Sequence, residues 1–178
     1  PKAALATDAG LHRLVWELEW QGADRLAGAK VDLGDPTIGP DAIPGRYTLR
    51  LVAGERVATT NAEVRPDPRS KVPQAELEEQ LEAVLAIRER IDSLVADARR
   101  VRAIAAQARE LADRLADPIA GDERALALIG AASVLADRCD ELEARLHNSK
   151  AEVVYDILAR PGGTQLHSNL TFLYVSLA

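Results

Sequence analysis

The segment Arg-Pro-Asp-Pro-Arg-Ser-Lys-Val-Pro (65–73) divides the chain into two parts of different character. Before this segment, short stretches alternate apolar and polar residues, which is the period of a β-strand. After it, apolar residues recur at steps of three and four over about forty residues, which is the period of an α-helix. Pro68 and Pro73 bracket the entry to the expected helix. The sequence therefore predicts a β domain over residues 1–66 and a helical domain over residues 67–178.

The β domain contains three expected strands. In the first, over residues 14–20, apolar side chains share one face and glutamates share the other: Leu14, Trp16, Leu18 and Trp20 against Glu17 and Glu19. Residues 21–42 are rich in Gly, Asp and Pro and predict a long loop. Residues 47–51 form a second strand with an inward apolar face, and residues 56–64 return as the third. Because a thin sheet leaves its edges unpaired, we expect pairing partners upstream of Pro1 or in another chain.

The helical domain opens with glutamates, which suit the positive end of a helix, and continues as a heptad repeat. The apolar residues at one heptad position are Leu77, Val84, Ile91, Ala98, Ala105 and Ala112. Those at the other position are Ile87, Leu94, Val101, Ala108 and Leu115. We define the helical seam as Val84, Ile87, Ile91, Leu94 and Val101. Beyond the seam the repeat turns to alanine, which predicts a close approach of two helices.

Asp117-Pro118 ends this helix and Gly121-Asp122 begins a second one, so a short connection predicts an antiparallel helical hairpin. The second helix is expected to face the first with a stripe of apolar residues: Leu128, Leu135, Cys139, Leu142 and Leu146. Short C-terminal helices are expected over residues 151–158 and after Thr164. The last of these places four leucines on one face: Leu166, Leu170, Leu173 and Leu177.

Composition excludes several classes of partner. The net charge is −6 over 178 residues, without a basic stripe, and nucleic-acid binding needs clustered Lys and Arg, so no nucleic acid is expected. No apolar run approaches the ~18 residues of a membrane-spanning helix, so no direct span is expected. The chain begins at Pro1 and contains no methionine, which we interpret as a processed product or an excised piece.

Catalytic chemistry has little support in the sequence. His12, His147 and His167 lie in different elements without metal-ligand spacing, so surface or capping roles are expected. Cys139, the single cysteine, falls on the apolar stripe and is expected to be a core thiol. We therefore predict no enzyme activity, no cofactor and no metal site.

Trp16, Trp20 and Tyr47 allow two interpretations. The favoured one is that they form the core of a thin sheet packed on a helix end. The alternative is a platform on which a sugar stacks. Two exposed, coplanar rings would favour the sugar platform, and full burial would remove it.

Five stretches together resemble a known region: Ala-Gly-Leu-His-Arg-Leu-Val-Trp-Glu-Leu (9–18), Ile-Pro-Gly-Arg-Tyr-Thr-Leu-Arg-Leu (43–51), Val-Arg-Pro-Asp-Pro-Arg (64–69), Leu-His-Asn-Ser-Lys-Ala-Glu-Val-Val-Tyr-Asp-Ile-Leu-Ala (146–159) and Gly-Gly-Thr-Gln-Leu-His-Ser-Asn-Leu (162–170). They are similar to the C-terminal region of bacterial sortilin-like proteins with BNR-repeat β-propellers, often labelled glycosyl hydrolase-like. The resemblance implies an Ig-like strand unit, a helical hairpin and a periplasmic or secreted location. It spans nearly the whole chain, but it consists of turns, core aromatics and a helix entry, so no catalytic residue is transferred.

The expected fold is thus α+β: a partial Ig-like β-sandwich followed by a long antiparallel helical hairpin with short C-terminal helices. The expected function is that of a non-catalytic structural or interaction subunit, a processed C-terminal fragment of a sortilin-like propeller protein. Such a fragment would scaffold other protein subunits in a larger periplasmic or membrane-associated complex, for example a photosynthetic reaction centre assembly. The alternative is a carbohydrate-binding accessory module of a secreted glycosyl hydrolase-like protein. A third interpretation is a homodimer through the helical seam.

Overall fold

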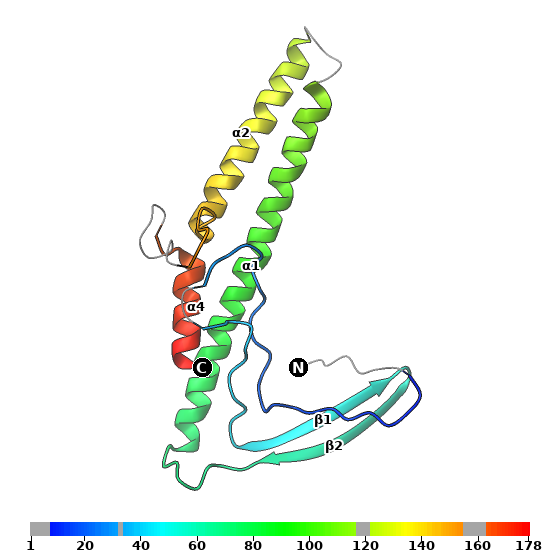
Figure 1. Ribbon diagram of the computed structural model, residues 1–178, viewed down its shortest axis with the longest axis vertical. Coiled ribbons are helices and arrows are strands. Elements are labelled where there is room, and N and C mark those ends of the chain that lie inside the picture. The colour runs from blue at the N-terminus through cyan, green and yellow to red at the C-terminus, as the bar shows by residue number, and fades with distance from the viewer. Residues whose placement is uncertain (1–7, 32–33, 117–121, 155–162) are drawn as a thin grey trace.

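The structure, a computed structural model, describes residues 8–31, 34–116, 122–154 and 163–178 (Figure 1). The strands β1 (Gly45–Ala53) and β2 (Arg56–Val64) precede the helices α1 (Gln74–Ala116), α2 (Glu123–Leu146) and α4 (Leu166–Leu177). α1 is the longest element, with α2 antiparallel to its C-terminal half and α4 beside its N-terminal half (Figure 1). The predicted order, a β element followed by a long helical hairpin, is confirmed.

The β element is a two-stranded antiparallel hairpin. Its register runs from Gly45 opposite Val64 to Ala53 opposite Arg56. Gly54, in the connecting turn, has a φ of 60°, which glycine adopts without the steric cost of a Cβ atom. The described residues form no second sheet, so the Ig-like sandwich stays a prediction.

The strand expected over residues 14–20 is wrong. The segment is extended chain without strand pairing, and only Glu19 forms an isolated bridge, with Asp41. Leu18 has a φ of 62°, outside the β region, so the alternating run is interrupted before its end. Leu14 is 57% exposed. Alternation alone does not make a strand when no described neighbour supplies the paired backbone.

The long loop predicted after Trp20 is confirmed, and it folds back on itself. The Trp20 N–H donates to the carbonyl of Pro40 at 2.9 Å. Gly39 has no room for a side chain there, because a Cβ atom would lie 1.7 Å from the carbonyl oxygen of Trp20. The closed loop presses Ala23 and Leu26 onto α1, so a segment without regular structure supplies part of the core.

The helical seam of α1 is buried, as predicted. Val84, Ile91 and Leu94 are 1%, 0% and 5% exposed, and Ile87 and Val101 are half-buried. All of them except Val101 lie in one cluster with residues of the loop, of α1 and of α4: Ala23, Leu26, Val95, Ala98 and Tyr174. The N-terminal half of α1 therefore packs against the loop and α4.

The contact between α1 and α2 is made by alanines. Ala108 of α1 packs against Ala132 and Ala136 of α2, and Cys139 is buried beside them, as predicted for a core thiol. The rest of the predicted stripe is largely wrong, because three leucines are 54%, 47% and 44% exposed: Leu128, Leu135 and Leu142. Small side chains bring the helix axes close together, so the larger ones next to them are left outside the contact.

α4 confirms one of the two expected C-terminal helices, although its N-cap is Gln165 rather than Thr164. The predicted apolar face is wrong for three of its four leucines, because only Leu170 packs on the core. The outer side carries the half-exposed leucines Leu166, Leu173 and Leu177, and the inner side carries the buried residues His167, Thr171 and Tyr174. Residues 151–154 are not helical, and the remainder of the helix expected over 151–158 lies outside the described residues.

Candidate functional site

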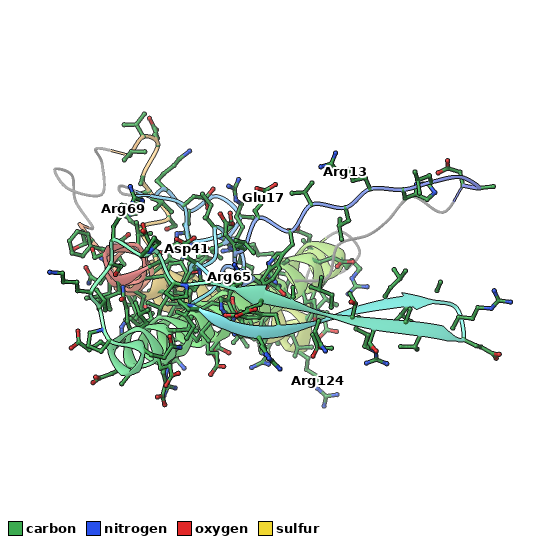
Figure 2. The ribbon with its side chains drawn as sticks, turned by 90° about the horizontal axis from the view of Figure 1, so that it is seen from below. Arg13, Glu17, Asp41, Arg65, Arg69 and Arg124 are labelled. Carbon is green, nitrogen blue, oxygen red and sulfur yellow. The ribbon has the colours of Figure 1, made fainter. Side chains whose placement is uncertain are left out.

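The β-hairpin is the most exposed element of the structure. No residue of either strand is buried, and only Tyr47, Ala62 and Val64 are half-buried. In Figure 2 the hairpin extends away from the helices, and the segment carrying Arg13 passes to one side of it. A two-stranded hairpin alone in water is marginally stable at best. Contacts within the described chain therefore bury little of this element.

The two faces of the hairpin differ in chemistry. Directly opposed residues of an antiparallel pair share a face, so the register assigns Tyr47, Leu49, Leu51, Ala58, Thr60 and Ala62 to one face. The other face carries Arg46, Thr48, Arg50, Thr59, Asn61 and Glu63, with Val52 and Val57 near the turn. Leu49 and Leu51 are 41% and 50% exposed. One face is thus largely apolar and open to solvent.

The structure brings together two of the three predicted aromatic residues. The rings of Trp16 and Tyr47 lie 5.1 Å apart at an angle of 62°, which is an edge-to-face contact. The Trp16 Nε1–H donates to the carbonyl of Glu19 at 3.0 Å, and the Tyr47 hydroxyl donates to the carbonyl of Ile43 at 2.7 Å. Among the described residues, Trp20 makes no ring contact with this pair.

Trp16 and Tyr47 are half-buried and not coplanar, so they form no flat platform for a sugar ring. They join the N-terminal segment to the base of the hairpin instead. The carbohydrate interpretation stays a prediction without support from the ring geometry. The other predicted site, the helical seam, packs against the chain's own loop and α4 at every residue but Val101, so this part of it is not available to a second copy.

A polar junction that the sequence did not predict lies where α2 ends. The Arg102 Nε–H donates to Oε1 of Glu143 at 2.7 Å, and another N–H of Arg102 donates to the carbonyl of Ala27 at 2.8 Å. Nε2 of His147 lies 2.8 Å from the same Glu143 oxygen and 2.9 Å from Arg102. The junction therefore ties α1, the end of α2 and the loop together.

The neighbours of Glu143 favour its ionised form. Burial by itself raises the pKa of Glu143, but the hydrogen bonds from His147 and Arg102, together with their charges, bring that pKa below its ordinary value. His147 is 3% exposed and so does not lie on the surface, but it has the capping role that was the predicted alternative: it is the C-cap residue of α2, and its backbone N–H donates to the carbonyl of Glu143. The i, i+4 spacing of Glu143 and His147 was a signal in the sequence, since such pairs are neighbours on a helix.

His167 is the second buried histidine, and it too lies where the sequence did not predict. It is 2% exposed, and both ring nitrogens are buried without a hydrogen-bond partner among the described residues. Burial lowers the pKa of His167 to about 4, and the charge of His147 lowers it as well. His12, in contrast, is exposed as predicted.

His167 contributes to the wall of a cavity of about 330 Å³ that is also lined by Arg25, Lys30 and Asp35. Its nitrogens are closed to solvent, and Arg25 is already paired with Asp35 at 3.2 Å. In the described part of the chain, no three His, Cys, Asp or Glu side chains are placed to hold a metal ion. We assign His167 a structural role.

None of the described helices combines the length and apolar character that crossing a bilayer requires. No protein-family model, no curated protein and no solved structure matches the chain. We therefore infer function from the surfaces of the chain.

Proposed function

We propose that this chain is a non-catalytic structural subunit that joins other protein subunits in a larger complex, and that a partner completes its β-hairpin. The single observation behind the proposal is the exposure of the hairpin: two strands of 9 residues each, with no buried side chain. Folding such an element costs backbone entropy that its own contacts barely repay. A bound partner would supply the missing burial.

The hairpin offers two means of contact. Among the described residues, the outer edges of β1 and β2 pair with no other strand, so each presents backbone donors and acceptors to an added strand. The face with Leu49 and Leu51 supplies apolar area beside those edges. A partner strand paired along one edge would satisfy the free backbone groups. Apolar side chains of the same partner, packed on this face, would cover Leu49 and Leu51.

The helices suit a scaffold. α1 has 43 residues, which at the rise of an α-helix corresponds to about 65 Å. It joins the hairpin at one end to the helical hairpin at the other, so partners at the two ends would be held at a fixed separation. The resemblance to sortilin-like C-terminal regions supports a periplasmic or membrane-associated complex, with a photosynthetic reaction centre assembly as one example.

Leu51→Asp is expected to separate the chain from its partners, because it places a charge on the apolar face, beside Leu49. The measurement is native co-purification of the tagged chain from its source, with quantitative mass spectrometry of the accompanying chains. We expect partner recovery to fall at least about tenfold, equivalent to about 1.4 kcal/mol of binding.

Thr59→Asp is the matched control, since Thr59 lies in the same hairpin on the opposite face. It should retain the partners, and circular dichroism should show unchanged helix content in both variants. Recovery of the wild-type chain alone, or equal recovery of partners by both variants, would reject the proposal.

A further inference from the structure

The helical hairpin has an apolar face that the described chain leaves uncovered. We call it the leucine face, and it consists of Ile104, Leu111, Leu128, Leu135 and Leu142. These side chains are between 39% and 54% exposed. On each helix they follow one another at seven-residue steps, the spacing that matches one further helix laid alongside.

The two long sides of the helical hairpin have opposite chemistry. On one side, ion pairs bridge the helices: Arg102 of α1 with Glu143 of α2 at 2.7 Å, and Arg109 with Asp140. These contacts pair arginines of α1 with carboxylates of α2 on that side. This side of the helical hairpin therefore presents few unpaired charges to a partner.

The leucine face lies on the other side. Ile104, Leu111 and Leu142 each follow an ion-pair residue of their own helix by two positions. Two positions turn about 200° round a helix, so these side chains point away from the ion pairs. Both helices therefore contribute apolar residues to the same side.

A row of arginines borders the leucine face on α2. From Ala132 to Leu135 to Arg138, each step of three residues turns about 60° round the helix, from a buried to a half-exposed to a charged side chain. Arg145 repeats the position of Arg138 one heptad later. Within the described residues, neither arginine forms an ion pair with a carboxylate, whereas Arg102 and Arg109 both do.

We propose that the leucine face binds an amphipathic helix with acidic flanks, supplied by a partner protein, which completes a three-helix bundle with α1 and α2. The seven-residue spacing selects a helix, and the unpaired arginines select its charge, because residues that flank a heptad core set partner choice through ion pairs. A second copy of the chain would bring the same arginines to the interface and is disfavoured. The inference rests on the proposed structural role but uses a different surface from the β-hairpin, so either can fail alone.

The test is titration of the full chain with a synthetic heptad-repeat peptide that has leucine and isoleucine in its core and glutamate in the flanking positions. Isothermal titration calorimetry should give micromolar affinity, and a peptide with lysine in place of glutamate should not bind. Leu135→Ala should weaken binding of the acidic peptide about tenfold. Arg138→Glu should weaken it to a similar extent and should allow the lysine peptide to bind.

Leu126→Ala is the matched control, because Leu126 is a leucine of the same helix, 59% exposed, outside the leucine face. It should change the affinity by less than about twofold, as should Leu51→Asp in the β-hairpin. If the acidic peptide does not bind the wild-type chain, or if Leu126→Ala weakens binding as much as Leu135→Ala, the inference is wrong. It is also wrong if the chain is a dimer that Leu135→Ala dissociates, since a second copy then covers the face.

Discussion

Ile91→Ala is expected to lower the free energy of unfolding by about 3 kcal/mol, within the range for buried isoleucine truncations. Ile91 is fully buried in the cluster that joins α1 to the loop and to α4, with Leu26 and Tyr174 as neighbours from those two elements. Truncation leaves a cavity that a close-packed cluster fills only in part, so its cost exceeds the transfer free energy of the lost methylenes. Urea unfolding followed by circular dichroism measures the change.

Ile104→Ala is the control on the same helix. Ile104 is 39% exposed, so its truncation is expected to cost less than about 1 kcal/mol in the isolated chain. The contrast tests whether the loop and α4 pack on α1 as the structure shows. Equal effects of the two truncations would mean that the cluster around Ile91 is not formed in solution.

The heptad repeat made the core of α1 predictable. Val84, Ile91 and Leu94 are large apolar residues at regular spacing in a long run without Gly or Pro, and only one face of such a helix can be buried. The identity of what covers that face was not predictable. The loop after Trp20 has no periodicity, and its position depends on backbone hydrogen bonds between residues far apart in the chain.

The leucine stripe of α2 failed as a prediction because period alone does not distinguish neighbouring rows. The buried row with Ala132 and the half-exposed row with Leu135 differ by about 60° on the helix. Hydrophobicity ranks leucine above alanine, but α1 also offers alanines at the contact, and the closest packing of the two helices selects the small row. The leucines that this choice leaves in solvent are the reason for inferring a partner helix.

The prediction of which face of α4 is buried failed for a related reason. His167, Thr171 and Tyr174 share a helix face, but sequence reasoning gave the buried face to the leucines. The Tyr174 hydroxyl donates to the carbonyl of Ile38 at 2.9 Å, a partner in the loop that no local pattern reveals. Arg102 and Glu143 were missed likewise, since nothing in either helix alone shows that they meet.

His167 should make the stability of the chain depend on pH between about 8 and 5. Burial lowers its pKa from the ordinary 6.5 to about 4 in the folded chain, so the unfolded chain takes up the proton first. The stability is then fully present above pH 6.5 and is lost as the pH falls toward 4. At pH 5 the loss amounts to about 2 kcal/mol relative to pH 8. Urea unfolding at the two pH values measures it.

His167→Leu should remove this dependence, because leucine keeps the buried volume and takes up no proton. Glu143 does not contribute to the loss of stability between pH 8 and pH 5. Its pKa is lowered in the folded chain from an ordinary value of 4.5, so its contribution is lost only as the pH falls below that value, outside the range tested. His12→Leu is the control, since His12 is exposed, and it should leave the difference between pH 8 and pH 5 as in the wild type. If His167→Leu retains the full difference, His167 is not the group responsible, and the burial that the structure gives it is not maintained in solution.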